Sequence, residues 1–182
     1  MLFNKNYLKD SLYLSWMIEV VVKGRGGQGA KTAVEVLARA ANHEDKFFLA
    51  YPEFGPERSG TPINAYFKLN DTLVRSRSPI KSPDIILVLD TSLDKFASGI
   101  KKKGMIIVNS VDEKKYHFVD AEKIAKEIVG RSLPNIIMLG ALVKITKILK
   151  KESVEKAIKD SFKGKIADMN LKCFDEGFKN AK

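Results

Sequence analysis

The sequence predicts an α/β domain, and three observations carry that prediction. Short β-branched or continuously apolar runs alternate along the chain with segments of helical periodicity. The first apolar run ends in a glycine-dense turn that opens directly into a helical pattern. Two later runs, 84–90 and 104–109, are apolar nearly throughout, as are strands buried on both faces of a parallel sheet. At 182 residues the chain suffices for one domain, so we expect a three-layer, Rossmann-like fold with a mostly parallel sheet and one antiparallel hairpin.

The first half of the chain is expected to begin with a strand, a glycine turn and a helix. The strand covers 18–24, and an apolar stripe at helical spacing follows the turn. The stripe consists of Ala33, Val36, Leu37, Ala40 and Ala41. A second strand at 46–52 leads into a Gly- and Pro-rich loop at 53–62. Apolar and polar residues then alternate over 63–76 around an Asn-Asp pair, which predicts a hairpin with one exposed face.

The second half is expected to complete the parallel sheet and its helical cover. A crossover helix at 92–104 would join the two buried strands. A short strand at 117–120 precedes a helix that Asp120 caps and Gly130 ends. The segment 134–149 is apolar nearly all round, which is typical of a helix sunk against a sheet. Two shorter helices, 153–162 and 166–179, are expected at the end of the chain.

The charge of the chain is strongly positive, with a formal net value of +10. The lysines are nevertheless spread along the sequence and interleaved with Glu and Asp, and no motif of a nucleic-acid-binding fold accompanies them. We therefore favour a solvated, Lys-rich surface and expect no nucleic-acid partner. Attraction of an acidic protein or a polyphosphate ligand is the secondary interpretation.

Several classes of protein are excluded by composition. Cys173 is the single cysteine, so the chain forms no internal disulfide and cannot hold an iron-sulfur cluster by its own thiolates. His43 and His117 are the only histidines, and neither has an acidic cluster at ligand spacing, so we expect no metal site and no catalytic histidine. No apolar run reaches the roughly 20 residues of a membrane helix, and the first 16 residues do not resemble a secretion signal. A cytoplasmic location without a membrane contact is expected.

The glycine-dense turn has the spacing of a dinucleotide-binding fingerprint. Gly24, Gly26 and Gly29 match G-x-G-x-x-G between a predicted strand and a predicted helix. Such glycines let the backbone approach a phosphate, whose charge then lies at the positive end of the helix. Arg25 and Lys31 could add positive charge.

The remainder of a nicotinamide-dependent enzyme does not accompany this turn. The fingerprint expects an acidic residue about 20 positions later, and the candidate, Glu53, lies inside the Pro-rich loop. No recognisable set for proton or hydride transfer is present. The residues alone support two interpretations of the glycine turn equally: it binds an anion, or it only allows close packing between the strand and the helix. A stand-alone nucleotide-binding or sensor module stays open as the alternative function.

Four segments together resemble a known family. They are "GRGGQGAKTAVEVLA", "YPEFGPERSGTPINAYFKLND", "RSPIKSPDIILVLD" and "NIIMLGALVKI". The chain resembles the gamma subunit of the 2-oxoacid:ferredoxin oxidoreductases, the pyruvate synthase family, from about Met17 to the C-terminus. The Y-P-E-x-G-P-E-R-x-G-x-P block is the most specific part. We therefore expect a single gamma domain over 17–182, preceded by an extension at 1–16 that is either an arm or sequence upstream of a true start at Met17.

The resemblance implies one subunit of a larger enzyme. Such complexes oxidatively decarboxylate a 2-oxoacid, pass electrons to ferredoxin and form an acyl-CoA. The implied partners are alpha, beta and delta subunits, which hold thiamine diphosphate with magnesium and the [4Fe-4S] clusters. No cofactor is held, and no catalytic residue supplied, by this chain alone. The form of the Pro-rich block resembles the pyruvate or branched-chain type more than the 2-oxoglutarate or indolepyruvate type, and we expect pyruvate as the substrate with branched-chain 2-oxoacids as the alternative.

The resemblance also suggests two sets of site residues. The glycine turn would face the CoA phosphates or a neighbouring subunit's active-site channel through Gly24, Arg25, Gly26, Gly27, Gln28 and Gly29. The Pro-rich loop would contact other subunits through Tyr51, Glu53, Glu57, Arg58 and Pro62. Two alternatives remain: a loop in which Arg58 pairs internally with Glu53 or Glu57, and a spacer whose glycines bind nothing.

Overall fold

The structure is a computed structural model that describes residues 17–53, 60–93 and 95–182. Within these residues the chain forms one six-stranded sheet with the order β2-β3-β1-β4-β5-β6. The strands are β1 (Met17–Arg25), β2 (Phe47–Pro52), β3 (Pro62–Asn70), β4 (Ile85–Val88), β5 (Met105–Asn109) and β6 (His117–Val119). The predicted strands are therefore present, with ends that differ by a few residues, except for the second strand of the hairpin expected after residue 71.

The sheet is mixed, and its parallel part is central to the site. β1 pairs in parallel with β4, with Val20 opposite Ile85, and β4–β5 and β5–β6 are also parallel. β3 runs antiparallel to both of its neighbours, β1 and β2. The carboxyl ends of β1, β4 and β5 consequently lie at one edge of the sheet, where α/β proteins commonly bind ligands.

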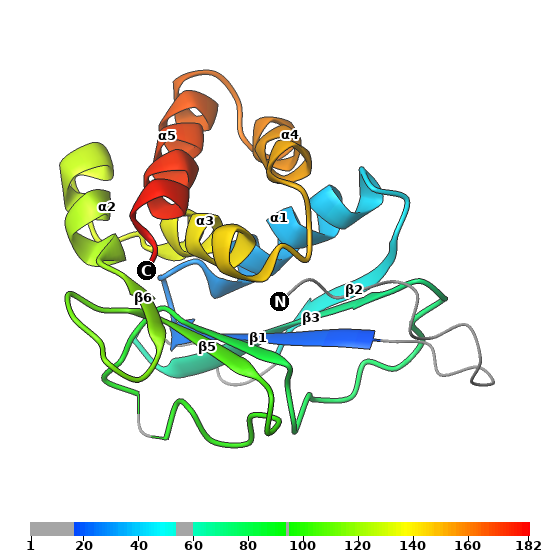
Figure 1. Cartoon of the computed structure of the whole chain (residues 1–182). Coiled ribbons are helices and arrows are strands. Elements are labelled where there is room, and N and C mark those ends of the chain that lie inside the picture. Colours follow the sequence, from blue (N-terminus) through cyan, green and yellow to red (C-terminus); the bar gives the residue numbers. More distant parts are fainter. Residues whose placement is uncertain (1–16, 54–59, 94) are drawn as a thin grey trace.

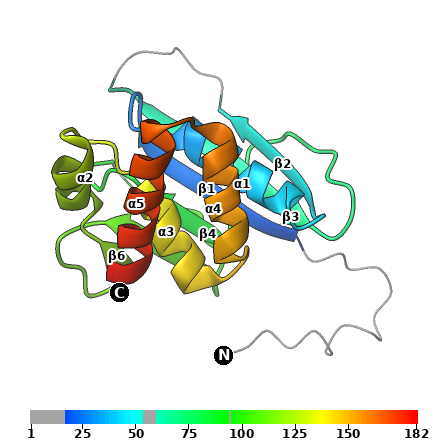
Figure 2. The same ribbon diagram turned by 90° about the horizontal axis from the view of Figure 1, so that it is seen from above.

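The helices all cover one face of the sheet. They are α1 (Ala30–Asn42), α2 (Ala121–Val129), α3 (Asn135–Thr146), α4 (Lys151–Ser161) and α5 (Lys165–Asn180). Figure 1 shows the five helices on one side of the strands, and Figure 2 looks down through them onto the sheet. The α/β class and the mostly parallel sheet of the prediction are confirmed.

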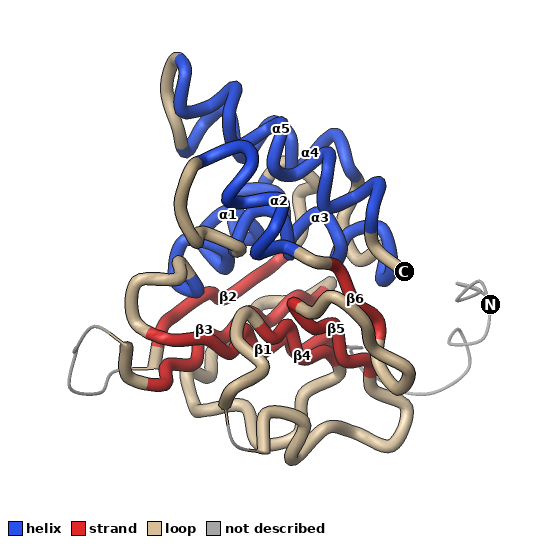
Figure 3. Tube along the Cα trace, turned by 90° about the vertical axis from the view of Figure 1, so that its left-hand side faces the viewer, coloured by secondary structure: helices blue, strands red, loops and turns tan. Residues whose placement is uncertain are grey.

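The opposite face is covered by loops, so the third layer contains no helix among the described residues (Figure 3). The helix predicted at 92–104 is wrong: the described part of that segment forms turns and bends. Gly99, at φ 81°, lies in the left-handed region, and a Cβ there would meet the carbonyl oxygen of Lys81 at 2.7 Å. Phe96 and Ile100 from this segment pack on Ile86 of β4 and its neighbours. The apolar residues of the segment are therefore buried against the sheet from a loop and not from a helix.

The prediction that the chain makes a hairpin turn at residues 70–71 is also wrong. Residues 71–84 form no strand, and β3 pairs instead with β2 and β1 on its two sides. The antiparallel hairpin is β2–β3, joined through the Pro-rich loop. The polar face of β3 is covered, because Tyr66 and Lys68 are each 4% exposed. The loop at 76–78 covers it, and the Nζ of Lys68 donates to the carbonyl of Ser76 at 3.2 Å.

The core follows the alternation of each strand. Val20 and Val22 point to the helical layer, whereas Val21 packs with Tyr51 and Tyr66 under the loop layer. Both faces of the central strands are therefore apolar, which explains the continuous apolar runs in the sequence. Burial of such side chains contributes on the order of 2 kcal/mol each.

Local signals at the helix ends are confirmed. Asp120 accepts the backbone N–H of Lys123 at 3.0 Å, and Gly130 ends α2 in the left-handed conformation. The sunken helix is α3, in which every residue from Asn135 to Val143 is buried. α5 crosses α3 so closely that a Cβ on Gly140 of α3 would collide with the backbone of α5, and a Cβ on Gly177 of α5 would collide with the backbone of α3. Among the described residues no helix is both long and apolar enough to cross a membrane.

Candidate functional site at the carboxyl ends of the parallel strands

The glycine turn joins β1 to α1 at this edge of the sheet. Gly27 and Gly29 have φ values of 96° and 81°, which residues with a Cβ rarely adopt. A Cβ on Gly29 would also collide with the side chain of Asn135 at the start of α3. The Nδ2 of Asn135 donates to the carbonyl oxygen of Gly29 at 3.2 Å. These two glycines are thus required for backbone conformation, and Gly29 also for a close approach.

The turn is hydrogen-bonded to the end of the Pro-rich loop. The N–H of Gly26 donates to the carbonyl of Thr61 at 2.9 Å, and the N–H of Gly60 donates back to the carbonyl of Gly26 at 3.2 Å. Arg25 is opposite Pro62 in the β1–β3 register. Two motifs that the sequence analysis treated separately are therefore one continuous backbone unit.

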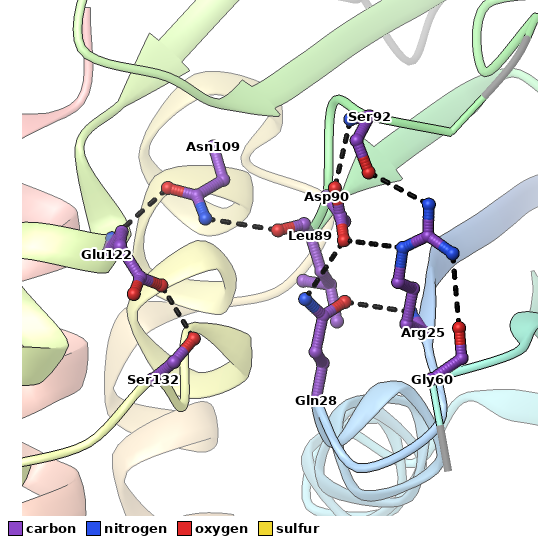
Figure 4. Close-up of polar contacts among 9 residues, drawn as sticks. All are labelled: Arg25, Gln28, Gly60, Leu89, Asp90, Ser92, Asn109, Glu122 and Ser132. Atoms are coloured by element: carbon purple, nitrogen blue, oxygen red, sulfur yellow. Dashed lines mark hydrogen bonds and ion pairs between the residues drawn. The ribbon is translucent and has the colours of Figure 1, made fainter.

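Arg25 binds three residues of two other segments through its guanidinium (Figure 4). Its Nε donates to Oδ2 of Asp90 at 3.0 Å, its Nη2 to Oγ of Ser92 at 2.9 Å, and its Nη1 to the carbonyl of Gly60 at 3.1 Å. The Arg25 side chain is 35% exposed and the Asp90 side chain 19%. The charge of Arg25 is therefore compensated inside the chain by Asp90.

Gln28 completes this network from inside the turn. Its Oε1 accepts the backbone N–H of Arg25 at 2.7 Å, and its Nε2 donates to Oδ2 of Asp90 at 3.3 Å. Burial alone would raise the pKa of the Asp90 carboxyl. Hydrogen bonds from Ser92 and Gln28, with the charge of Arg25, outweigh burial and hold that pKa below its usual range.

A crevice of about 380 Å³ opens beside the network. Asn109, at the end of β5, is one of its lining residues. The Nδ2 of Asn109 donates to the carbonyl of Leu89 at 3.0 Å, and its Oδ1 accepts the N–H of Ala121 at 2.9 Å. The lining residues are Gln28, Leu89, Asp90, Thr91, Asn109, Ser110, Val111, Asp120, Glu122 and Ser132. Asn109 thereby ties the end of β4 to the beginning of α2.

The electrostatics of the crevice are acidic. Three carboxylates, those of Asp90, Asp120 and Glu122, contribute to its lining, and no Lys or Arg does among the described residues. Glu122 accepts a hydrogen bond of 2.6 Å from Ser132, and this bond, together with Lys126, lowers the pKa of the Glu122 carboxyl despite burial. The lowered pKa values of Asp90 and Glu122 keep these two carboxylates anionic at neutral pH, so a phosphate inside the crevice would meet like charge.

A second crevice, of about 420 Å³, lies between the end of α3 and the beginning of α4. It is rich in lysines, and its lining also contains the carboxylates of Glu44 and Glu152. Glu44 accepts the N–H of Lys150 at 2.6 Å and pairs with Lys46 at 2.8 Å. This buried carboxylate ties the segment after α1 to the residue that precedes α4, so the crevice is explained as packing between helices.

The residues predicted for a subunit interface differ in their exposure to solvent. Tyr51 is 8% exposed, and its hydroxyl donates to the carbonyl of Ser78 at 2.6 Å. Glu53 and Pro62 are exposed. Glu57 and Arg58 lie outside the described residues, so the internal pairing of Arg58 is not addressed by the structure.

Glu53 is held by β3 and does not belong to the lining of the crevice. Its Oε2 accepts from Nδ2 of Asn64 at 2.5 Å. Burial, followed by a hydrogen bond to Glu53, raises the pKa of Tyr66 to about 12. Because Glu53 stands beside β3, it is not positioned as the ribose-binding acid of the crevice.

The histidines and the cysteine lie elsewhere. The Nε2 of His43 is 2.6 Å from Oδ2 of Asp160, where it links the end of α1 to α4, and His117 is an exposed residue of β6. Burial raises the pKa of the Cys173 thiol to about 11. No group of three potential metal ligands comes together within the described parts of the chain.

Four polar residues at this edge of the sheet, Asp90, Ser92, Asn109 and Asn135, are not among the site residues predicted from the sequence. Asp90 and Asn109 had a usable signal, because each closes a continuous apolar run that predicts a buried parallel strand. Side chains at those positions converge on the carboxyl edge of a parallel sheet. Asn135 carried no comparable signal, since its partner, Gly29, is 106 residues away.

The fold and the glycine turn define a class: a Rossmann-like domain whose turn is braced from within by an Arg-Asp pair beside an acidic crevice. The model of the pyruvate ferredoxin/flavodoxin oxidoreductase family matches residues 19–180. The chain belongs to this family.

Relatives and solved structures agree with this membership. The chain is 43% identical over 177 residues to the pyruvate/ketoisovalerate oxidoreductases common subunit gamma of Thermococcus litoralis, covering 89% of this chain and 96% of the relative. It is 42% identical over 163 residues to the pyruvate synthase subunit PorC of Methanothermobacter marburgensis, covering 85% and 92%. The crystal structure of pyruvate oxidoreductase subunit PORC from Thermotoga maritima superposes with a TM-score of 0.82 at 32% identity, covering 91% of this chain and 97% of that one.

Proposed function

We propose that this chain is the gamma subunit of a multisubunit 2-oxoacid:ferredoxin oxidoreductase with pyruvate as its principal substrate. The complex would oxidatively decarboxylate the 2-oxoacid, form an acyl-CoA and reduce ferredoxin. The observation that carries the proposal is the family match over residues 19–180, together with relatives of about this length named as gamma or PorC subunits. One relative is named as common to pyruvate and ketoisovalerate enzymes, so both substrates belong in the test.

The chemistry of decarboxylation and electron transfer would be supplied by other subunits. The chain has one cysteine, whereas a [4Fe-4S] cluster needs about four thiolates. We therefore assign the clusters to other subunits, and, as the resemblance implies, we also assign thiamine diphosphate and magnesium to the alpha, beta and delta subunits of a cytoplasmic complex. This chain would contribute a docking surface and a backbone turn next to the active-site channel.

For the glycine turn we favour contact with a neighbouring subunit over contact with the CoA phosphates. The guanidinium of Arg25 already serves Asp90, Ser92 and Gly60, and the crevice beside it is lined by carboxylates. Gly27 is exposed on the outer side of the turn, and Lys31 is 66% exposed there with a 3.9 Å contact to Glu35. A CoA phosphate has a suitable approach only on that outer side.

The proposal is tested by purifying the tagged chain from its native cells without oxygen. Mass spectrometry should identify three further subunits, and the preparation should reduce ferredoxin only when a 2-oxoacid and CoA are both present. Pyruvate, ketoisovalerate and 2-oxoglutarate are compared at equal concentration, with the highest rate expected for pyruvate. Recovery of the chain alone, or with unrelated proteins, contradicts the proposal.

The stand-alone nucleotide-binding module is tested on the isolated chain. Equilibrium dialysis with NAD, FAD and ATP should show no tight binding of any of the three nucleotides. Tight binding of one of them would favour the module over the subunit.

A further inference from the structure

The loop layer opposite the helices carries positive charge that nearby carboxylates do not balance. Two of its segments, 72–83 and 95–104, contain Arg and Lys but no Asp or Glu, and Figure 3 shows loops on the side of the strands away from the helices. Exposed basic side chains of these segments that have no carboxylate partner among the described residues are those of Arg75, Arg77, Lys81, Lys102 and Lys103.

The two segments meet at the amino ends of β1 and β4. Glu19 connects them, because its Oε1 is 3.7 Å from Nζ of Lys68 and its Oε2 is 3.7 Å from Nζ of Lys101. The Nζ of Lys68 also donates to the carbonyl of Ser76 at 3.2 Å. Ser76 lies between the two exposed arginines, and Lys101 directly precedes two of the exposed lysines. The basic side chains therefore border one network and form a single surface.

The backbone that carries the arginines is anchored, although the arginine side chains are exposed. The hydroxyl of Tyr51 donates to the carbonyl of Ser78 at 2.6 Å, and Ile80 packs in the apolar cluster under the loop layer. Pro79 and Pro83 restrict the same stretch further. Positive charges on a fixed backbone lose little conformational entropy when a partner docks.

We propose that this surface recruits the ferredoxin that accepts electrons from the complex. The basic loop surface consists of Arg75, Arg77, Lys81, Lys102 and Lys103. The inference deepens the proposed function and rests on it. Its partner is a small protein that is anionic around an iron-sulfur cluster, because the charge of the thiolate ligands exceeds that of the cluster core. A positive surface attracts such a protein over long range and raises its association rate. No redox step is assigned to this chain.

Exposed apolar side chains at the same end favour a protein over a polyphosphate or a nucleic acid. Leu73, two residues before Arg75, is 60% exposed, and Phe47 is 46% exposed. Phe47 is opposite Asn70 in the β2–β3 register, so its side chain shares the sheet face of Lys68. A protein surface can bury such side chains, whereas phosphate groups gain nothing from them.

The position of the basic loop surface also suits a soluble acceptor. It lies at the amino ends of β1 and β4, whereas the glycine turn proposed to contact a neighbouring subunit lies at the carboxyl end of β1. The helices provide a contrast in charge. On α4 and α5, carboxylates recur among the lysines, and Lys151 pairs with Glu155 at 3.1 Å and with Asp175 at 2.7 Å.

The experiment uses the assembled oxidoreductase with two electron acceptors. Initial rates with pyruvate and CoA are measured at increasing concentrations of ferredoxin from the same cells, and separately with methyl viologen, a small cation that needs no basic surface. The loop variant combines Arg75→Glu, Arg77→Glu, Lys102→Glu and Lys103→Glu. The control changes the net charge equally at exposed positions in and between α4 and α5, and combines Lys156→Glu, Lys159→Glu, Lys163→Glu and Lys165→Glu.

The loop variant should be impaired with ferredoxin alone. We expect its KM for ferredoxin to rise about tenfold at low salt, with kcat and the rate with methyl viologen unchanged. The KM of the wild type should increase with added salt, because salt screens exposed charges, and the KM of the loop variant should depend less on salt. The control should keep the wild-type KM.

An unchanged KM in the loop variant overturns the inference, as does an equal rise in the control, which would assign the effect to net charge. If the glutamates lower the melting temperature, the same four positions are changed to glutamine and judged by the same criteria. Loss of affinity for a short single-stranded RNA at unchanged KM would assign the surface to nucleic acid and also overturn the inference. If the wild-type complex reduces neither acceptor with a 2-oxoacid, the proposed function fails instead.

Discussion

The two ends of β1 and β4 carry similar ion pairs in different surroundings. At the amino end, Oδ2 of Asp84 accepts the backbone N–H of Glu19 at 2.9 Å and pairs with Lys101 at 2.8 Å. At the carboxyl end, Asp90 pairs with Arg25 at 3.0 Å. Each pair closes a strand end against a long loop.

The difference lies in what each network holds. The amino-end network continues inward to Lys68, which is 4% exposed and 3.7 Å from Glu19, so it fastens the loop layer onto the sheet. The carboxyl-end network instead borders a crevice and holds exposed glycine backbone. The comparison teaches that two partly exposed ion pairs, Lys101–Asp84 and Arg25–Asp90, differ in what lies beside them: a buried lysine under the loop layer at the amino end and exposed glycine backbone at the carboxyl end.

Gly29→Ala should have the largest effect on the carboxyl end. Alanine would be strained at φ 81° and would collide with the Asn135 side chain. We expect the free energy of unfolding to fall by about 2 to 4 kcal/mol, measured by urea denaturation. The double variant Gly29→Ala/Asn135→Ala should recover the steric part but not the backbone part. An unchanged unfolding midpoint in the single variant would contradict the described turn.

Lys68→Met tests the amino end. The change leaves the carbonyl of Ser76 without its donor and removes one partner of Glu19, so we expect a loss of about 1 to 3 kcal/mol. Lys102→Met, at an exposed position of the same face, is the control and should be close to neutral. Assembly with partner subunits should be normal for both. If Lys68→Met weakened assembly at unchanged stability, the amino end of β1 and β4 would affect assembly as the carboxyl end is expected to, which would contradict the difference proposed between the two ends.

Asp90→Asn should make a smaller difference that depends on pH. The folded-state pKa of Asp90 is lowered, so its contribution is present above the unfolded-state pKa of about 3.9 and is lost as the pH falls through the folded-state pKa. We expect the wild type to exceed Asp90→Asn by about 1 kcal/mol at pH 7. The gap should shrink below about pH 4, as measured by denaturation at both values. A gap that widens in acid would reverse the assignment.

Glu53→Gln should have the smallest effect, confined to Tyr66. The carboxylate of Glu53 adds to burial in raising the pKa of Tyr66 to about 12. Glutamine removes the charge but leaves the burial, so the pKa should fall and still exceed the usual value of about 10. Ultraviolet titration of the phenol measures it, with Tyr66→Phe identifying the signal. An unchanged Tyr66 titration would place Glu53 away from β3.

The sequence predicted the features that depend on local chemistry. The caps at Asp120 and Gly130 and the buried runs of β4 and β5 follow from residues a few positions apart. The prediction of a helix at 92–104 was wrong because it could not foresee the close approach between Gly99 and the backbone at Lys81. The sequence predicts only that Arg25 could add positive charge beside the glycine turn, since nothing near it in the sequence reveals its partner Asp90, 65 residues away.

The most direct test of this account compares hydrogen exchange in the isolated chain and in the assembled oxidoreductase. We predict slower exchange on assembly for segments 24–29 and 60–64 at the carboxyl end of β1. Exchange in segments 80–84 and 98–104 at the opposite end should not change. Protection of the amino-end segments with none at the glycine turn would contradict the proposed contact between the glycine turn and a neighbouring subunit.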